Sequence, residues 1–429
     1  MRKTYISMVL VTLLLFLFSC NGGVDSPTSS SNKKLVLDLK DASTIYIGKS
    51  SQSSSRDIGN GSSQNKIFKV TEDGYSQEVT YYYETDVYDN KGNVVGKKKE
   101  KVTEVMVPEK LIKLNENYLI VSFGYYNSYL VDTKTGYCFN YPFEPPYYST
   151  YSYFYGESVQ CDATGNIYTN DWHKLIKIDI SDPQNLSVEQ INPPTERMEG
   201  IEWAVDSKGN CAYRAIDELG NYVLRLKKKT GGYMNLPGDA SSQLYFWQGL
   251  DGQIYYLCGI YMYNAKVKKI DNQNYVISDV DSDDSYYYPW KALLRAKNKN
   301  RIVAVAENEI YELYNPDTNK ITKKQASAIG LNKIKFAVSS DDFYYFVGTD
   351  ANNNCKVVKV DPVTYQYEYL LSDGEYDVYN LSINKNSIVF NALRMSDGAI
   401  VMGRINNNGN IKILDDKLES QVTVLERIN

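Results

Sequence analysis

The chain has 429 residues, of which 43% are hydrophobic and 23% are charged, and its formal net charge at pH 7 is −5. A mildly acidic chain lacks the electrostatic footprint of a nucleic-acid-binding protein, so we expect no nucleic-acid partner. His173 is the single histidine, which excludes any metal site built from several histidines.

The chain opens with a charged start and an apolar run. Arg2 and Lys3 precede the apolar residues 8–18, which are too few to span a bilayer, since that needs roughly 20. The run ends in Leu-Phe-Ser-Cys at positions 17–20. This ending resembles a bacterial lipobox, which implies that residues 1–19 are a lipoprotein signal peptide and that Cys20 carries the lipid. An ordinary signal peptide with a chance cysteine is the alternative.

A polar stretch follows the cysteine. Residues 21–33 read NGGVDSPTSSSNK and show no apolar periodicity, so we expect residues 20–32 to be the lipidated cysteine and a flexible tether. A Gly/Ser-rich coil of this length spans roughly 20 Å. Asn21, rather than Asp, favours the outer membrane by analogy with diderm bacteria. The pattern does not indicate whether the periplasmic side or the cell surface holds the protein.

A pattern of about 45 residues repeats over the rest of the chain. A short apolar strand after a polar turn is followed about 10–25 residues later by an apolar residue with charged or amide neighbours. After one longer first interval, these flanked residues recur at a nearly constant spacing along the chain. They are Val70, Val131, Ile178, Leu226, Ile270, Leu313, Val360 and Ile405.

Four short alternating strands per unit are typical of a propeller blade. We therefore predict that residues 33–429 form one all-β domain, a single β-propeller of about eight four-stranded blades. Seven blades with an N-terminal addition are the alternative. The stretches 33–39 and 421–428 are both strand-like. We expect them to lie near each other and close the ring, because an open propeller would expose strand edges.

Residues 78–106 interrupt the even spacing. They pair with each other as a long hairpin, in which Glu84 faces Lys99 and Asp86 faces Lys97, both favourable cross-strand pairs. We expect an inserted hairpin that projects from the first blade. It is either a surface decoration or an arm that docks a partner.

Residues 139–155 are rich in aromatic side chains and contain three prolines, which forbid a regular central strand. We expect a connecting loop with an exposed aromatic platform for a glycan, a peptide or a membrane interface. A loop that packs on the rim of the ring is the alternative. The candidate binding residues are Tyr147, Tyr148, Tyr151 and Tyr153.

Trp203 and Trp247 occupy nearly equivalent places in successive units. At the start of innermost strands, they would approach the mouth of the central channel, although packing between blades is the alternative. Trp172 and His173 lie in a second-to-third strand loop, and residues 217–220 occupy the corresponding loop of the next unit. We expect these loops to share one face with the tryptophans and add Trp172 and His173 to the candidate binding residues.

The turns between third and fourth strands read Asp-x-x-Thr at Asp132 and Asp361, and Lys-Lys-Lys-Thr-Gly without the acid at 227–231. This repeat resembles that of quinoprotein-type propellers, which include cofactor-binding dehydrogenases and an eight-bladed outer-membrane lipoprotein. The tryptophan that closes those repeats is replaced by residues 139–140 and Asn235, and no two cysteines are adjacent. We therefore expect no quinone cofactor.

Other catalytic and metal-binding signatures are missing. The sequence has no P-loop, no G-x-S-x-G and no H-E-x-x-H motif. The run Asp279, Asp281, Asp283 and Asp284 is like the start of a calcium loop, but its sixth and twelfth positions hold Asp284 and Trp290. We expect a solvated acidic turn and no metal ion.

These features favour a membrane-anchored lipoprotein that acts as a non-enzymatic binding or scaffold propeller in the cell envelope. The alternative is a carboxylate-based glycan hydrolase or lyase, because two suitably placed acids suffice for glycoside hydrolysis. We expect a monomer without cofactors that contacts the membrane through its lipid. Envelope proteins or glycans are the expected partners.

Overall fold

The predicted all-β class is confirmed by the computed structural model, in which the described residues form 35 strands and two short 3₁₀ helices. No helix among them is long and apolar enough to cross a membrane. The predicted signal peptide and tether lie outside the described residues. These are 33–49, 64–103, 106–123, 127–141, 159–171, 173–238, 240–241, 245–258, 266–280, 290–315, 320–372, 374–384, 387–406, 409–422 and 424–427.

The chain folds as two compact units. Unit 1 comprises Met1–Asp38 and Thr80–Glu104, and unit 2 comprises Leu39–Val79 and Val105–Asn429. The hairpin that interrupts the repeat therefore belongs to a unit of its own, together with the residues that precede the first repeat.

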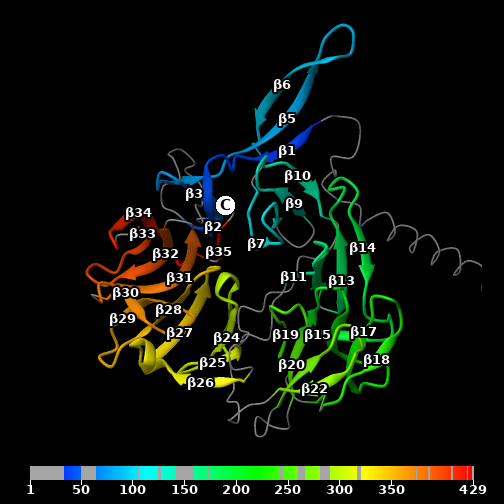
Figure 1. Cartoon of the computed structure of the whole chain (residues 1–429). Helices are drawn as coiled ribbons and strands as arrows, with labels where there is room; N and C mark the ends of the chain where they lie inside the picture. The colour runs from blue at the N-terminus through cyan, green and yellow to red at the C-terminus, as the bar shows by residue number, and fades with distance from the viewer. Residues whose placement is uncertain are drawn as a thin grey trace, which may run out of the picture. The chain divides into compact units, whose positions relative to one another are not determined.

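Unit 1 contains a three-stranded antiparallel sheet in the order β1-β5-β6, which we call the arm (Figure 1). Its strands are β1 (Lys34–Leu37), β5 (Tyr81–Tyr88) and β6 (Val94–Lys101).

The register of the arm confirms the predicted hairpin, because Glu84 faces Lys99 and Asp86 faces Lys97. The backbone N–H of Asp89 donates to the carbonyl of Asn93 at 2.9 Å, which closes the turn.

Unit 2 contains eight antiparallel four-stranded sheets in the described part of the chain, which are the blades of the propeller (Figure 1). Blade 1 consists of β35 (Val424–Arg427), β2 (Ala42–Gly48), β3 (Lys66–Thr71) and β4 (Ser76–Glu78). Blade 2 consists of β7 (Lys110–Lys113), β8 (Tyr118–Ser122), β9 (Ser128–Asp132) and β10 (Cys138–Asn140). Blade 3 consists of β11 (Val159–Cys161), β12 (Ile167–Asp171), β13 (Lys174–Asp179) and β14 (Ser187–Gln190). Blade 4 consists of β15 (Arg197–Val205), β16 (Cys211–Ile216), β17 (Tyr222–Lys227) and β18 (Tyr233–Asn235).

The second half of the ring continues the same order. Blade 5 consists of β19 (Tyr245–Gln248), β20 (Ile254–Cys258), β21 (Lys266–Ile270) and β22 (Ile277–Asp279). Blade 6 consists of β23 (Ala292–Ala296), β24 (Arg301–Val305), β25 (Glu309–Tyr314) and β26 (Thr322–Gln325). Blade 7 consists of β27 (Lys333–Ser339), β28 (Tyr344–Thr349), β29 (Cys355–Val360) and β30 (Tyr367–Leu371), and blade 8 of β31 (Tyr376–Asn384), β32 (Ser387–Arg394), β33 (Ile400–Asn406) and β34 (Ile411–Leu418). The 3₁₀ helices are η1 (Lys297–Lys299) and η2 (Ala326–Ile329).

The repeating apolar residue of the sequence marks one structural position. It lies on the third strand from the centre in every blade, from Val70 on β3 to Ile405 on β33. All eight of these residues are at most 3% exposed. The pattern is regular because a strand alternates its side chains between two faces, and a blade must bury this side chain against the rest of the core.

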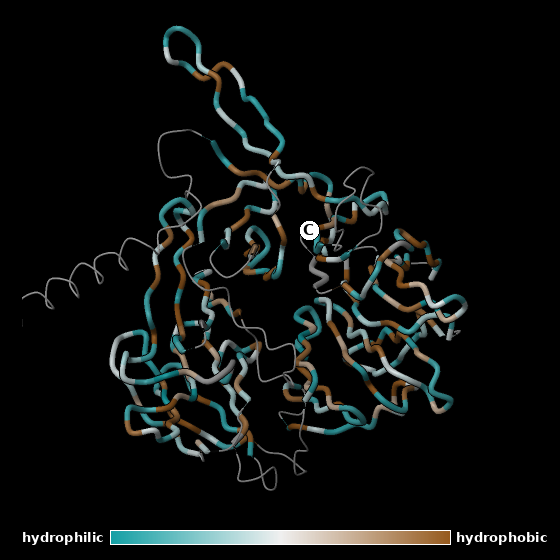
Figure 2. The backbone as a smooth tube through the Cα atoms, turned by 180° about the vertical axis from the view of Figure 1, so that it is seen from behind, coloured by the Kyte–Doolittle hydropathy of each residue, from teal (hydrophilic) through white to brown (hydrophobic). Residues whose placement is uncertain are grey.

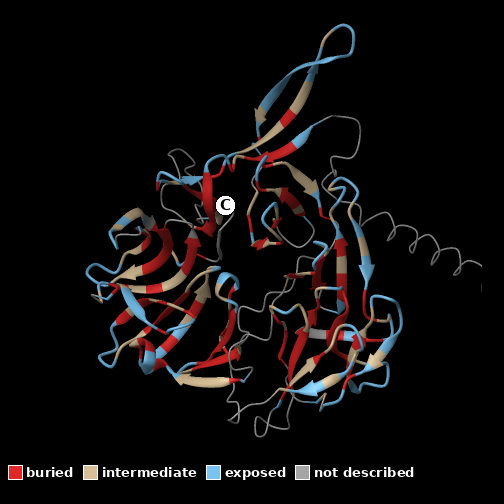
Figure 3. Ribbon diagram, in the orientation of Figure 1, coloured by how far each residue is buried: buried red, intermediate tan, exposed pale blue. Residues whose placement is uncertain are grey.

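Apolar clusters between neighbouring blades form the core of unit 2, and Figure 3 shows the buried residues concentrated along the blade strands. One cluster packs Ile112 of blade 2 with Ile176 of blade 3, and another packs Leu226 of blade 4 with Phe246 of blade 5. Similar clusters join blades 3 and 4, 5 and 6, 6 and 7, 7 and 8, and 8 and 1. Blades 1 and 2 meet where β35 contacts β7, so the ring is complete.

The ring closes through β35, but its partner differs from our expectation. β35 pairs with β2, with Ile45 facing Glu426 and Ile47 facing Val424. The prediction that residues 33–39 take this place is wrong, because β1 pairs with β5 of the arm. The strand β2 has a neighbour on each side and is buried along its whole length, as expected for a strand inside a blade.

Candidate functional site

Most of the predicted aromatic site lies outside the described residues. This holds for Tyr147, Tyr148, Tyr151, Tyr153 and Trp172, so their role in binding stays a prediction. His173 is exposed, and its backbone carbonyl accepts a hydrogen bond from the N–H of Met198 at 2.9 Å.

The two predicted tryptophans lie on the first strands of their blades, but their rings are inside the core. Trp203 is fully buried, and its Nε1 donates to Oδ1 of Asn170 at 3.3 Å. Trp247 is 1% exposed and stacks on Tyr255 with 5.7 Å between the ring centroids. It also meets Trp290 edge-on at 6.0 Å. The structure therefore favours the alternative of packing between blades for both residues.

Blades 3 and 4 contain an unusual density of buried polar side chains. Gln160 on β11 bridges the two blades, since its Nε2 donates to the carbonyl of Trp203 at 3.2 Å and its Oε1 accepts from the N–H of Val205 at 3.0 Å. Both bonds reach β15, the first strand of the next blade. A single side-chain amide thus continues the backbone hydrogen bonding across the junction.

A buried ion pair stiffens blade 4. Arg214 on β16 and Glu202 on β15 pair directly, and their side chains are only 8% and 5% exposed. The Nε of Arg214 donates to the carbonyl of Ala240 at 2.6 Å, and its guanidinium lies 4.0 Å from the ring centroid of Tyr222. Buried charges persist only when they are paired and hydrogen-bonded in this way.

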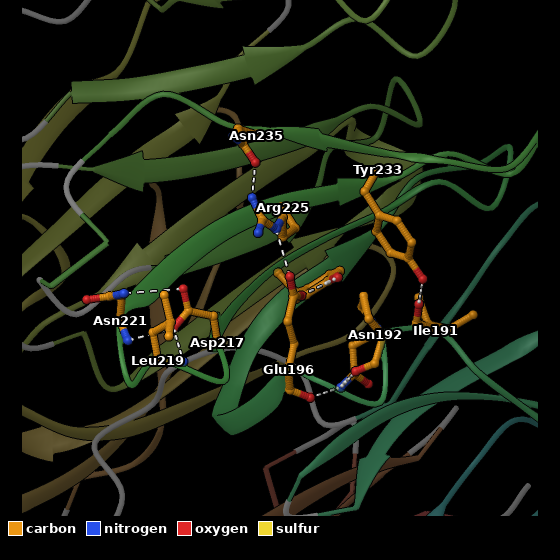
Figure 4. A network of polar contacts seen from close by, with 11 residues as sticks. Ile191, Asn192, Glu196, Asp217, Leu219, Asn221, Arg225, Tyr233 and Asn235 are labelled. Atoms are coloured by element: carbon orange, nitrogen blue, oxygen red, sulfur yellow. Dashed lines mark hydrogen bonds and ion pairs between the residues drawn. The ribbon is translucent and has the colours of Figure 1, made fainter.

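A second network surrounds Glu196, where the chain enters blade 4 (Figure 4). Its carboxylate accepts hydrogen bonds from the hydroxyl of Tyr213 at 2.9 Å and from Nε of Arg225 at 2.8 Å. Its backbone carbonyl accepts from Nδ2 of Asn192 at 2.6 Å, and Oδ1 of Asn192 accepts from the N–H of Leu175 at 2.8 Å. Burial, with the nearby charge of Glu196, raises the pKa of Tyr213 well above its ordinary value.

Five-residue turns that begin with aspartate end the first strands of blades 3 and 4. In residues 206–210, Oδ1 of Asp206 accepts from the N–H groups of Lys208 and Asn210 at 2.9 and 2.8 Å, and Oδ2 accepts from Nδ2 of Asn210 at 2.6 Å. The turn needs a residue with positive φ, which Gly209 supplies at 89°.

The two buried turn aspartates differ in their electrostatics. Burial raises the pKa of Asp206, and its hydrogen bonds from Asn210 offset this only in part. For Asp162 burial again raises the pKa, but hydrogen bonds from Asn166 and Thr164 outweigh it and leave the pKa below its ordinary value.

Hydrogen bonds between blades connect these turns into one surface. The N–H of Ala163 donates to the carbonyl of Ser207 at 3.0 Å, and the N–H of Ser207 donates to the carbonyl of Gly252 at 2.8 Å. The hydroxyl of Tyr275 reaches Oδ1 of Asn210 at 3.5 Å. We call the surface formed by turns 162–166, 206–210 and 249–253 the turn face, and it is held rigidly across blades 3 to 5.

A basic patch lies on the turn face. It consists of Lys208 together with Lys228 and Lys229 from the third-to-fourth strand turn of blade 4. None of the three forms an ion pair with a carboxylate within the described residues. The Nζ of Lys228 lies 4.5 Å from the ring centroid of Tyr275, and the N–H of Lys229 donates to Oδ1 of Asn210 at 2.8 Å. We call these three residues the lysine patch.

Residues 227–231 form a third-to-fourth strand turn without the aspartate of the repeat, and the sequence predicts no site there. The departure itself was the available signal, because Asp132 and Asp361 occupy the corresponding position and use their carboxylates to accept backbone hydrogen bonds at 2.8 to 2.9 Å. Lys227 takes this position in blade 4, where its Nζ lies 4.6 Å from the ring centroid of Tyr233, and Lys228 and Lys229 of the lysine patch follow it in the same turn.

The buried carboxylates of the described residues are all engaged in structure. Each one accepts hydrogen bonds or pairs with a cation within its own unit. They are Glu84, Asp162, Glu196, Glu202, Asp206 and Glu312.

No group of three or more metal-ligating side chains is found in the described part of the chain. In the predicted acidic turn, Asp279 accepts from Nζ of Lys268 at 2.5 Å, and residues 281–284 lie outside the described residues.

No family model and no curated protein matches the sequence. Among solved structures, the chain is similar to the Dos1 propeller at 10% identity and a TM-score of 0.46, covering 87% of this chain and 93% of that chain. It is similar to TolB from Acinetobacter baumannii at 11% identity and a TM-score of 0.32, covering 83% and 80%. A third similarity is to PorZ, a surface component of the type-IX secretion system of Porphyromonas gingivalis, at 12% identity and a TM-score of 0.39, covering 81% and 44%. These similarities concern the fold alone.

Proposed function

We propose that the chain is a lipid-anchored, non-enzymatic binding protein of the cell envelope, and that its propeller binds an acidic segment of a partner through the lysine patch. The anchor rests on the Leu-Phe-Ser-Cys sequence at positions 17–20 and the polar stretch behind it.

The observation that carries the proposal is a set of three lysines that form no ion pair within the described residues, on a rigid surface of an acidic protein. The chain has a net charge of −5, and the three lysines gather positive charge beside Asp271, whose pKa is lowered by backbone hydrogen bonds of its own turn and further by the charge of Lys208. Charge of this kind guides association and selects the partner by complementarity. The hydrogen bonds between blades fix the turns, so little conformational entropy is lost on binding.

The buried carboxylates favour binding over glycan hydrolysis. A hydrolase needs two carboxyl groups about 5–9.5 Å apart beside the substrate, one of them as an acid or base. Glu196 and Glu202, the buried glutamates of blade 4, are instead neutralised by Arg225 and Arg214. Their chemistry serves the stability of the blade.

The lysine patch can be tested with a labelled polyglutamate peptide and the protein at low salt. Lys208→Gln/Lys228→Gln/Lys229→Gln should weaken binding roughly tenfold, since an exposed charge contact contributes about 0.2–1 kcal/mol.

The matched control replaces three exposed lysines on blades 2, 6 and 8, namely Lys134→Gln/Lys297→Gln/Lys412→Gln, and should bind as the unmodified protein does. Cross-linking on intact membranes, followed by mass spectrometry, should give the same difference between the two variants. Equal binding by the patch variant and the control would contradict the proposal. In the same membranes, Cys20→Ala should abolish labelling by fatty acid, and persistent labelling would rule out the anchor.

A further inference from the structure

The arm concentrates positive charge in a protein that is otherwise acidic. Its described residues, 33–38 and 80–103, contain seven lysines and five acidic residues, whereas the remainder of the chain from residue 39 onwards is net negative. Four of the lysines, at positions 97, 98, 99 and 101, lie on β6, which forms one edge of the sheet.

These lysines exceed the carboxylates that they contact. Lys97 and Lys99 share the buried carboxylate of Glu84, with Nζ–Oε distances of 2.7 and 4.0 Å. Lys98 forms an ion pair with Glu100 with an Nζ–Oε distance of 2.8 Å, and Lys33 forms a second ion pair with Glu100 at 3.3 Å. Glu84 and Glu100 thus each pair with two lysines. Because side chains alternate along a strand, Lys97, Lys99 and Lys101 share one face of the sheet with Glu84 and Asp86, and three lysines there oppose two carboxylates.

The end of the arm is apolar as well as exposed. Val87 and Tyr88 at the end of β5, and Val94 and Val95 at the start of β6, are 42% to 63% exposed. They flank the polar turn 89–93, and Figure 2 shows these hydrophobic segments directly behind the hydrophilic turn. Protein surfaces that insert into the interface of a bilayer typically combine exposed apolar side chains with lysines.

The position of the arm in the chain favours the membrane as its binding partner. β1 begins at Lys34, immediately after the short polar stretch that follows the predicted lipid attachment at Cys20. A Gly/Ser-rich stretch of that length would span roughly 20 Å as a coil, which would keep the first strand of the arm close to the bilayer. A protein strand that adds to β6 is disfavoured, because lysines on an edge strand discourage pairing with another strand.

We propose that the arm binds the surface of a membrane that contains anionic lipids, with the lysines of β6 at the headgroups and the valines and tyrosine of its end in the interface. The position argument rests on the lipid anchor of the proposed function, whereas the charge and exposure of the arm do not. Such binding would give the anchored protein a second membrane contact and a fixed orientation of unit 1.

The test uses the chain from residue 21 to residue 429, which has no lipid and keeps every described residue. It should sediment with vesicles of phosphatidylcholine and phosphatidylglycerol mixed two to one, and not with vesicles of phosphatidylcholine alone. In 1 M salt the binding should fall sharply, because screening then acts over about 3 Å. Lys98→Gln/Lys101→Gln should weaken the partition about 30-fold, since each lysine near an anionic surface contributes about 1 kcal/mol.

This pair of lysines leaves Glu84 with both of its partners, so the arm should remain folded. Val94→Ser/Val95→Ser should also weaken binding and tests the apolar contribution separately. The matched control, Lys134→Gln/Lys297→Gln, removes the same charge from exposed positions on blades 2 and 6 and should bind vesicles within about twofold of the unmodified chain.

The proposal is overturned if the unmodified chain does not distinguish the two vesicle types, or if the control loses as much binding as the arm variant. It is equally overturned if the arm variants bind vesicles normally and lose a cross-linked protein instead, which would make the arm a protein-docking element. The vesicle assay needs neither the lipid nor the lysine patch. Its results can therefore be interpreted even if the Cys20 or lysine-patch experiments contradict the proposed function.

Discussion

The pair Glu202 and Arg214 illustrates how single residues determine the stiffness of blade 4. Two opposite charges on side chains that are only 5% and 8% exposed lose most of their hydration, and their mutual contact restores only part of that free energy. Replacing both residues by apolar ones should therefore destabilise the protein less than replacing only one of them. The same reasoning applies to Glu196, whose carboxylate has both Tyr213 and Arg225 as donors.

Arg214→Met should lower the free energy of unfolding by about 3–5 kcal/mol, because it leaves Glu202 buried and without its cation. Glu202→Leu/Arg214→Met should regain most of that loss, since no buried charge remains. Urea unfolding of the two single variants and the double variant measures the coupling. If the effects of the single changes simply add in the double variant, the pair is not coupled and the interpretation is wrong.

At the scale of elements, the aspartate turns recur in both units with the same hydrogen bonds. The turns that begin at Asp89 and Asp217 repeat the arrangement of Asp206, with carboxylate oxygens that accept from backbone N–H groups two and four residues later. Hydrogen bonds from the backbone of Asn93 and Asn221 hold the pKa of Asp89 and Asp217 below the ordinary value. The pKa values of Asp271 and Asp361 are also lowered, because backbone N–H groups of their own turns donate hydrogen bonds to these carboxylates.

These lowered pKa values predict how stability depends on pH. A carboxyl group with a lower pKa in the folded state contributes stability above its unfolded pKa, near 3.8, and loses it as the pH falls through the folded value. The melting temperature should therefore decrease on acidification below about pH 4. Asp217→Asn should reduce that decrease, whereas Glu218→Gln, on the neighbouring exposed residue, should leave it unchanged. An identical pH profile for all three proteins would contradict the prediction.

The elements differ in how far the sequence predicts them. The second and third strands of each blade were predictable, because a buried residue such as Ile178 or Leu226 recurs wherever a blade repeats the same packing. The sheet that receives β1 was not predictable, since residues 33–39 and 42–48 both read as strands and only pairing over a long distance separates them. The orientation of Trp203 was ambiguous for a similar reason, because the ring of an inner-strand residue can face either the channel or the next blade.

The candidate site was harder to predict than the fold. The lysine patch combines residue 208 with residues 228 and 229, which come together only when two turns of blade 4 lie on the same face. The long hairpin, in contrast, was predictable with its register, because complementary charges such as Glu84 and Lys99 oppose each other at a fixed spacing.

At the scale of the whole molecule, stability depends on the closure of the ring by β35. Deletion of residues 421–429 would leave β2 with one unpaired edge and remove the contacts of β35 with β7 and β31. The melting temperature should fall by more than about 5 °C, which corresponds to a loss of one or more kcal/mol. Deletion of residues 428–429 alone should have little effect. If both truncated chains melt together with the full chain, closure does not contribute to stability.

The same closure makes the folding of unit 2 sensitive to chain length. Blade 1 takes three strands from the beginning of the repeat region and its fourth from residues 424–427, so a strand synthesised after all the other blades completes the first one. Until then the ring retains an unpaired edge, a feature that promotes aggregation and misassembly. A chain that ends early can build seven blades and still remain open. Only a chain that extends through residues 424–427 can seal the ring, and every product that ends before them keeps an open strand edge.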